Sequence, residues 1–134
     1  MSTSYSAAGH PRVTCLIDGE GGFELKGKTL GIVGAGAIGL RVAELFHALG
    51  TAILAYEPHP KAKVPAYITF AALDEVLARS DIVTLHCLLN DGTRGLINRE
   101  RIGRMKRGAY LINAARGPVV DSAALAAALN DGYL

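Results

Sequence analysis

Short apolar runs alternate with amphipathic segments from residue 28 to the end of the chain. The runs are rich in β-branched residues and are bounded by glycine, proline or charged residues, which is typical of buried strands. The predicted strands are Thr29–Val33, Ala52–Tyr56, Ala66–Ile68, Ile82–His86 and Ala109–Asn113. Strands that alternate with helical segments predict a parallel sheet covered by helices.

The segments between the strands have apolar side chains at helical spacing. Gly50 ends the first predicted helix, whose apolar stripe consists of Ile38, Val42, Leu45, Phe46 and Leu49. The other expected helices are one around Leu73–Leu77 that ends near Ser80, one capped by Asn98 that runs to about Lys106, and one capped by Asp121. With right-handed crossovers these elements predict a doubly wound α/β sheet, a Rossmann fold, with the strands in the spatial order 3-2-1-4-5.

The domain organisation follows from a change in composition near residue 25. Residues 1–24 are rich in Ser, Gly and Pro, so we expect an irregular lead-in with a short extended piece at Val13–Ile17. Residues 25–134 form the predicted domain. A sixth strand normally follows the last helix of such a sheet, so we expect a partial domain in which that strand is missing. The unpaired edge would favour self-association, and a homodimer is the expected assembly.

Composition and charge narrow the class of protein and its partners. Half of the 134 residues are apolar and the net charge is +2, which suits a globular domain and favours neither nucleic acid nor a membrane as a partner. Five cationic side chains lie between Arg99 and Arg107, where the solvated face of a helix is the favoured interpretation. Cys15 and Cys87 are far apart and lack metal-ligand spacing. We therefore expect no metal site and a cytoplasmic protein in which Cys87 is buried and reduced.

The turn Gly34-Ala35-Gly36-Ala37-Ile38-Gly39 directly follows the first predicted strand and opens the first predicted helix. A G-x-G-x-x-G pattern is weak by itself, but this position is the context in which it binds a dinucleotide. Gly34 permits a tight turn, Gly36 lets the backbone approach a pyrophosphate, and Gly39 allows close packing of helix on strand. The free N–H groups of the first helical turn would then face the phosphates. A glycine-rich turn that binds no nucleotide remains the alternative.

An acidic residue at the end of the second strand is the other part of this fingerprint. Glu57 directly follows Tyr56, at about the expected 20 residues after the first glycine. Its carboxylate can accept hydrogen bonds from the hydroxyls of the adenosine ribose and would repel a 2′-phosphate, so NAD is the predicted cofactor. Lys61 and Lys63 follow closely and could receive such a phosphate, which leaves NADP as an alternative.

Four segments carry a more specific pattern: residues 25–39 (LKGKTLGIVGAGAIG), 80–87 (SDIVTLHC), 93–98 (TRGLIN) and 111–121 (LINAARGPVVD). In this order they resemble the nucleotide-binding domain of the D-isomer-specific 2-hydroxyacid dehydrogenases, over roughly residues 24–134. The resemblance implies a Rossmann fold that binds NAD. It also implies NAD-linked interconversion of a 2-oxo acid and a D-2-hydroxy acid, which would be the substrate and product of the parent enzyme.

The resemblance also implies roles for single positions. Arg116 would be the catalytic arginine that holds the substrate carboxylate and keto oxygen, and a guanidinium fork suits that contact. The expected cofactor-binding residues are Gly34, Gly36, Ala37, Ile38, Gly39, Glu57, Cys87, Leu88, Thr93, Ala114, Ala115 and Arg116. Among these, Ala37 and Ile38 would contact the pyrophosphate, and Ala114 and Ala115 would pass beneath the nicotinamide. A solvated loop arginine is the alternative for Arg116.

The chain also departs from the family's pattern. Ala37 stands where Arg or His is frequent, Leu88 where Pro is usual, and Glu57 replaces the commoner Asp. The acid and histidine that donate the proton in the family would lie beyond Leu134, and the substrate domain would be missing as well. We therefore expect the chain by itself to bind NAD weakly and to turn over little or nothing. A non-catalytic NAD-binding or interaction module is the alternative function.

Overall fold

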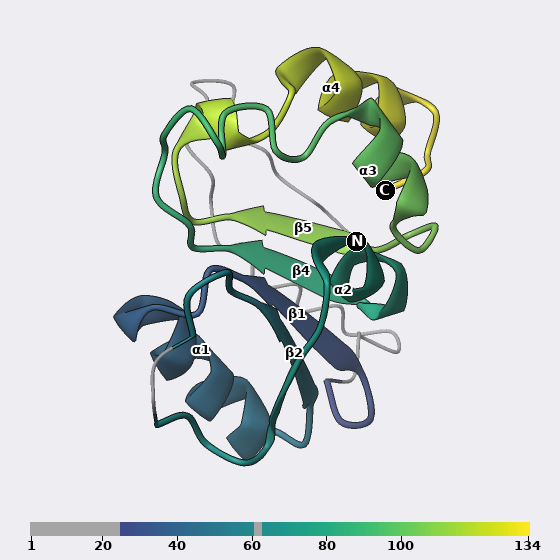
Figure 1. The fold of residues 1–134 in the computed structure, drawn as a ribbon. Helices are drawn as coiled ribbons and strands as arrows, with labels where there is room; N and C mark the ends of the chain where they lie inside the picture. Colours follow the sequence, from purple (N-terminus) through teal and green to yellow (C-terminus); the bar gives the residue numbers. More distant parts are fainter. Residues whose placement is uncertain (1–24, 61–62) are drawn as a thin grey trace.

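Parallel strands form one five-stranded sheet in residues 25–60 and 63–134, the part of the chain that the computed structural model describes (Figure 1). The strand order β3-β2-β1-β4-β5 confirms the predicted one. The strands are β1 (Thr29–Val33), β2 (Ala52–Tyr56), β3 (Ile68–Phe70), β4 (Ile82–Leu85) and β5 (Tyr110–Asn113). The helices are α1 (Ala37–Ala48), α2 (Leu73–Arg79), α3 (Arg99–Arg104), α4 (Ser122–Asn130) and the 3-10 helix η1 (Gly117–Val119). The predicted lead-in, with Val13–Ile17 and Cys15, lies outside the described residues.

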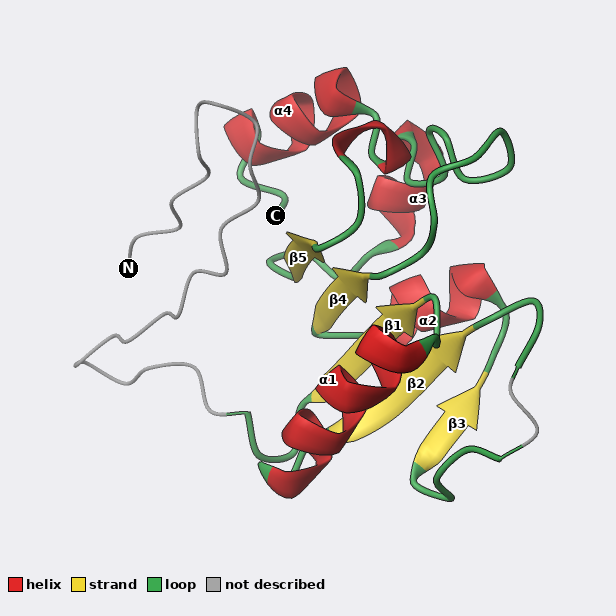
Figure 2. Ribbon diagram, turned by 90° about the vertical axis from the view of Figure 1, so that its left-hand side faces the viewer, coloured by secondary structure: helices red, strands yellow, loops and turns green. Residues whose placement is uncertain are grey.

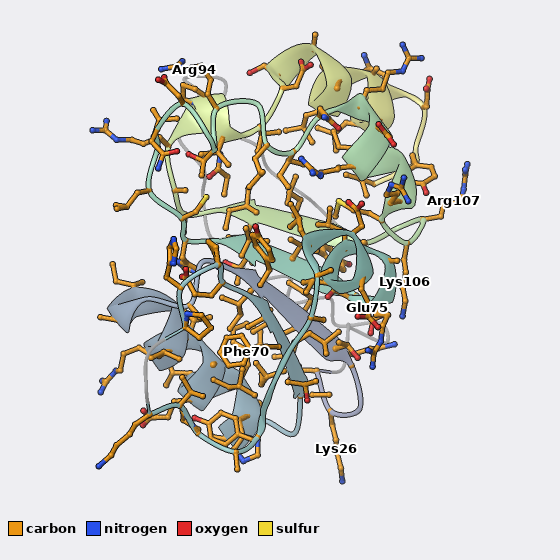
Figure 3. The ribbon with its side chains drawn as sticks, in the orientation of Figure 1. Lys26, Phe70, Glu75, Arg94, Lys106 and Arg107 are labelled. Atoms are coloured by element: carbon orange, nitrogen blue, oxygen red, sulfur yellow. The ribbon has the colours of Figure 1, made fainter. Side chains whose placement is uncertain are left out.

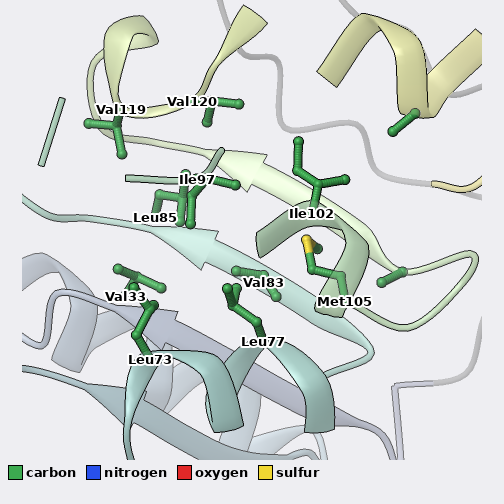
Figure 4. Packing of buried hydrophobic residues seen from close by; sticks show 12 residues of the cluster. Val33, Leu73, Leu77, Val83, Leu85, Ile97, Ile102, Met105, Val119 and Val120 are labelled. Carbon is green, nitrogen blue, oxygen red and sulfur yellow. The ribbon is translucent and has the colours of Figure 1, made fainter. Parts of the chain in front are cut away.

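Helices cover both faces of the sheet, and the side chains of β1 alternate between two cores. α1 packs on β1 and β2 from one side, and α2, α3 and α4 lie on the other (Figures 1 and 2). Leu30 and Ile32 enter the core beneath α1, whereas Val33 enters the core beneath α2 and α3 (Figure 4). This period of two, with apolar side chains on both faces, is what a central parallel strand requires.

The buried face of α1 differs from the predicted one. Much of the predicted stripe lies in solvent, with exposed fractions of 70%, 61% and 55% at Ile38, Leu45 and Leu49. The helix buries Gly39 and Ala43, and the stripe residues Val42 and Phe46 are partly buried against the same core. The buried face therefore overlaps the predicted stripe on one side only. The physical reason is close packing. A Cβ on Gly39 would collide with the carbonyl oxygen of Gly34, so the turn out of β1 leaves room only for a glycine.

β3 begins two residues later than the predicted Ala66–Ile68. The N–H of Ile68 donates to the carbonyl oxygen of Pro65 at 3.2 Å, which closes a turn over the intervening residues. The ring of Tyr67 stacks on that of His47 at 3.9 Å between centroids, so it packs against the end of α1 instead of joining the sheet. The ladder with β2 therefore starts at Ile68.

Both predicted N-caps are confirmed. The Asn98 side chain accepts a hydrogen bond from the N–H of Arg101 at 2.9 Å. The Asp121 carboxylate accepts from the first turn of α4 at 3.1 and 3.2 Å. α3 ends at Arg104, before the predicted Lys106, because Met105 leaves the helix and is buried in the core. None of the helices in the described part of the chain has the length and apolarity needed to cross a bilayer.

Candidate cofactor-binding site

The carboxyl ends of β1, β2, β4 and β5 meet at one edge of the sheet because the strands are all parallel. In Figure 1 the arrowheads of β4 and β5 point to this edge, on the left. Figure 3 shows Arg94, in the loop after β4, on this side of the molecule, and Lys106, just before β5, on the opposite side. The predicted cofactor and substrate contacts come from the loops that leave this edge, which is where open α/β sheets bind ligands.

Gly34 makes the turn out of β1 with a positive φ of 97°, a conformation that side-chain-bearing residues rarely adopt. Its N–H donates to the carbonyl oxygen of Tyr56 at 2.9 Å and so ties the turn to the end of β2. A Cβ on Gly34 would lie 2.7 Å from the backbone nitrogen of Cys87, so the loop after β4 presses against the same residue. Gly34 therefore lies where the ends of β1, β2 and β4 contact one another.

Gly36, in contrast, faces open space. It is the N-cap of α1 with a φ of −82°, and an added Cβ would meet no atom within 4 Å. The N–H groups of Ala37 and Ile38 make no hydrogen bond with the described residues, and both side chains are exposed. Free donors at the positive end of a helix suit an anion, and the missing Cβ leaves room for it. The residues present therefore fit a pyrophosphate.

Glu57 lies beside this turn, and its carboxylate is held in a fixed orientation. Oε1 accepts a hydrogen bond from the N–H of Ala35 at 3.0 Å, and Oε2 accepts one from the N–H of His59 at 3.1 Å. The side chain is half-buried. Since each carboxylate oxygen has a further lone pair, Glu57 can also accept hydrogen bonds from ligand hydroxyls. The glycine turn and the acid of the fingerprint are thus in direct contact.

The loop after β4 contributes Cys87, Leu88 and Thr93. Cys87 has no disulfide partner among the described residues, and it is only half-buried, so the prediction of a buried thiol was wrong. Partial burial and the nearby Glu57 carboxylate raise the pKa of the thiol. Leu88 is 83% exposed. The Thr93 hydroxyl is used within the loop, where it donates to the carbonyl oxygen of Leu88 at 2.5 Å and accepts from the N–H of Asn90 at 2.9 Å. Thr93 therefore shapes the loop that carries Leu88.

His86 stands between β4 and this loop. Its Nε2 lies 2.8 Å from the Oγ1 of the buried Thr84, and burial lowers the pKa of the imidazole. The ring has no carboxylate partner among the described residues. This arrangement favours a neutral ring that packs beside the strand ends.

The loop after β5 carries Ala114, Ala115 and Arg116. The N–H of Ala114 donates to the carbonyl oxygen of Leu85 at 3.1 Å, so the loop starts alongside the end of β4. Arg116 is exposed, and its guanidinium has no hydrogen bond or ion pair with any residue in the described ranges. β4 lies between β5 and β1, so the loop that carries Arg116 and the glycine turn leave the same edge of the sheet from strands that are not neighbours.

One residue of this loop was missed as a site residue. Asn113, the last residue of β5, accepts a hydrogen bond from the N–H of Ala115 at 3.0 Å through Oδ1 and donates to the carbonyl oxygen of Arg116 at 3.2 Å through Nδ2. The signal in the sequence was an asparagine directly after an apolar run, a residue type that often bonds the backbone two residues later. Nothing in the spacing showed that the second bond would go to the arginine.

A doubly wound parallel sheet with an open glycine turn, free donors at the start of α1 and an acid at the end of β2 defines a dinucleotide-binding Rossmann domain. Residues 17–134 match the family model for the D-isomer specific 2-hydroxyacid dehydrogenase, NAD binding domain. The chain belongs to this family and contains its NAD-binding domain, which confirms the resemblance carried by the four sequence segments.

Relatives with known sequences and structures agree with this assignment. The 2-hydroxyacid dehydrogenase A of Aspergillus oryzae is 45% identical over 118 residues, which are 88% of this chain and 34% of that protein. The glyoxylate reductase of Thermofilum pendens is 47% identical over 116 residues, 84% of this chain and 34% of that protein. The NAD complex of a D-isomer specific 2-hydroxyacid dehydrogenase from Lactobacillus delbrueckii superposes with a TM-score of 0.80 at 40% identity, over 84% of this chain and 34% of that one. The chain thus spans about a third of the length of these relatives.

Proposed function

We propose that this chain is the cofactor-binding part of an enzyme that interconverts 2-oxo acids and D-2-hydroxy acids. Bound NAD would supply the hydride acceptor for oxidation of the hydroxy acid. One sheet edge carries an oriented carboxylate, that of Glu57, an open glycine turn, and the guanidinium of Arg116, which has no ion pair within residues 25–60 and 63–134; this arrangement carries the proposal. Relatives named for 2-hydroxy acids and glyoxylate support this class of substrate.

The cofactor would lie across the carboxyl edge of the sheet, and residues 25–134 would form its binding unit. The backbone at Gly36, Ala37 and Ile38 would hold the pyrophosphate, with Gly34 and Gly39 shaping the turn. Glu57 would accept hydrogen bonds from the adenosine ribose. The remaining contacts of the predicted cleft would come from Cys87, Leu88, Thr93, Ala114, Ala115 and Arg116. For Thr93 the hydroxyl bonds favour an indirect contribution, through the loop that carries Leu88.

Arg116 would bind the substrate. An exposed guanidinium without an internal partner can form two parallel hydrogen bonds with a carboxylate, or one with the carboxylate and one with the keto oxygen. A buried or ion-paired arginine would first have to release its partner, and Arg116 has none among the described residues. Arg116 would thus orient the substrate from the same edge of the sheet that binds the cofactor.

Two further features belong to the same proposal. The exposed apolar side chains Ile38, Leu45 and Leu49 on α1 and the edge strand β5 favour association of two copies into a homodimer. The thiol of Cys87, free within the described part of the chain, favours a reducing compartment such as the cytoplasm. Sedimentation over a range of concentrations tests the first feature, and a chain that stays monomeric would contradict it.

Titration of the 134-residue chain with NADH and with NADPH, followed by fluorescence, tests the cofactor part. We expect saturable binding of NADH and weaker binding of NADPH, because Glu57 would repel the 2′-phosphate. Absence of NADH binding at concentrations up to about 1 mM would overturn the proposal.

The substrate part is tested with oxamate, an unreactive analogue of a 2-oxo acid, added to the NADH-saturated chain. Arg116→Ala should abolish the oxamate signal. Arg94→Ala is the matched control, because Arg94 is another exposed arginine in a loop at the same edge. If oxamate binds equally well to both variants, Arg116 is not the carboxylate anchor. A chain that binds NADH and no oxamate would instead favour a non-catalytic NAD-binding module.

A further inference from the structure

We propose that Asn113 is a positioning residue that sets the orientation of Arg116 toward the substrate carboxylate; this inference rests on the proposed function. Asn113 ends β5, where its backbone is opposite Leu85 in the ladder with β4. Its side chain is half-buried and reaches forward along the chain to the loop that leaves the sheet. It therefore connects the rigid sheet to the backbone of the proposed substrate-binding residue.

The two side-chain bonds of Asn113 hold consecutive parts of that loop. Oδ1 accepts from the N–H of Ala115 at 3.0 Å, which fixes the peptide between Ala114 and Ala115. Nδ2 donates to the carbonyl oxygen of Arg116 at 3.2 Å, which fixes the peptide after it. One side chain thus holds the peptides on either side of the Ala115–Arg116 pair, and this limits the directions that the Cα–Cβ bond of Arg116 can take.

Backbone hydrogen bonds restrain the chain after Arg116, and the first of them shares the Arg116 carbonyl oxygen with Asn113. The N–H of Val119 donates to the carbonyl oxygen of Arg116 at 3.1 Å. The N–H of Gly95 donates to the carbonyl oxygen of Pro118 at 2.8 Å, and the N–H of Ile97 donates to that of Val119 at 3.0 Å. These contacts tie η1 to the loop after β4. On the strand side of Arg116, the backbone bond from Ala114 to Leu85 holds the start of the loop, and Asn113 is the side chain that holds Ala115.

The guanidinium itself is held by nothing in the described residues, so its reach depends on the backbone that carries it. A shift of that backbone would move the far end of a long side chain by a larger amount. An amide suits this position better than a carboxylate does. Aspartate would keep the acceptor for Ala115, but it would lose the donor to Arg116 and add a charge that competes with the substrate for the guanidinium.

The test compares wild type, Asn113→Ala and Arg116→Ala as full 134-residue chains, with Asn98→Ala as the matched control. Asn98 is also an asparagine that accepts a backbone hydrogen bond, at the N-cap of α3. Three quantities are measured: the affinity for NADH, the affinity of the NADH-saturated chain for oxamate, and the amide NMR order parameters of Ala115 and Arg116. Thermal unfolding shows which variants are folded.

We expect Asn113→Ala to lower the affinity for oxamate by about tenfold or more, to keep the NADH affinity within about threefold, and to lower the order parameter at Arg116. Asn98→Ala should leave all three quantities unchanged. If Asn113→Ala does not fold, Asn113→Asp serves instead, because it keeps the acceptor for Ala115; it should weaken oxamate binding to a similar extent.

The outcomes separate this inference from the proposed function. If wild type binds NADH and oxamate and Asn113→Ala binds oxamate equally well, the positioning role is wrong and the proposed function stands. If wild type binds NADH and no oxamate, Arg116 is not a carboxylate anchor and the positioning role falls with it, whereas the cofactor site stands. If wild type does not bind NADH, the proposed function itself is wrong.

Discussion

The Glu57 carboxylate accepts a hydrogen bond from the backbone N–H of Ala35 at 3.0 Å, so the acid at the end of β2 is attached to the glycine turn at the end of β1. A second bond, from the N–H of His59 at 3.1 Å, holds the other carboxylate oxygen. The chain thereby sets the orientation of this group before any ligand binds. Such preorganisation lowers the entropy cost of recognising a ribose diol.

Replacing Glu57 by glutamine should weaken NADH binding and reduce discrimination against NADPH. Glutamine keeps one oxygen that can accept from Ala35, but it removes the charge and one acceptor. A hydrogen bond to a charged group contributes about 1.5–3 kcal/mol, so we expect a loss of about tenfold or more in NADH affinity. Calorimetric titration with both cofactors measures it. Glu44→Gln on the exposed face of α1 is the control, and equal effects of the two substitutions would contradict the assigned role.

Alanine substitutions at two glycines of the same turn should have different effects, one on NADH affinity and the other on the stability of the fold. Gly36→Ala should change the free energy of unfolding by less than about 1 kcal/mol, since its φ is −82° and its Cβ would meet no atom, yet NADH binding should fall. Gly34→Ala should destabilise the fold by about 2 kcal/mol or more, because φ is 97° and the Cβ would press on the Cys87 backbone. Urea unfolding and NADH titration of both variants check this. An intact NADH affinity in folded Gly36→Ala would be the contrary result.

Gly31 in β1 makes room for α2. A Cβ at this position would collide with the Oγ of Ser80 and lie 2.8 Å from Cγ1 of Val76. Overpacking of this kind costs about 1–3 kcal/mol, which we expect for Gly31→Ala in urea unfolding. Ser80→Gly removes the obstructing side chain, so the double variant should regain part of the loss. Strictly additive effects of the two substitutions would show that the residues are not coupled.

Asp81 should make stability depend on pH at the opposite edge of the sheet. Burial alone would raise the pKa of its carboxyl, but the hydrogen bond from the N–H of Thr29, at 2.9 Å, and the Lys106 ammonium, at 3.1 Å, hold that pKa below its usual value. A lowered folded-state pKa stabilises the protein above the unfolded pKa, and this contribution is lost as the pH falls through the folded value, that is, below about pH 4. The difference in unfolding free energy between wild type and Asp81→Asn should therefore shrink in acid.

Urea unfolding at about pH 7 and about pH 3 measures this difference. Asp91→Asn is the control, because Asp91 is exposed and has no ion pair among the described residues. A difference between wild type and Asp81→Asn that stays constant over this range would contradict the assignment.

Features that depend on neighbours along the chain could be predicted from the sequence. The strand at Thr29–Val33, the turn at Gly34–Gly39 and the caps at Asn98 and Asp121 are local, because backbone geometry and side-chain reach over a few residues decide them. The strand order was also accessible, since the spacing of strands and helices leaves few connections that are short and right-handed.

The placement of β3 and the buried face of α1 depended on the tertiary structure. Both sides of α1 are apolar, so hydrophobicity could not choose between them, and the choice was made by the close approach of Gly39 to the turn beneath it. The start of β3 was decided by the stacking of Tyr67 on His47, which are far apart in the sequence.

For the candidate site, too, some features follow from the sequence and others only from the tertiary structure. The sequence by itself determined which chemical groups are available: an open glycine turn, an acid after the second strand and Arg116 after the last. Only the tertiary structure decided what each group is attached to. The hydrogen bond between Glu57 and Ala35, and the bonds of Asn113 to the backbone of Ala115 and Arg116, require atoms brought within about 3 Å by the folded chain.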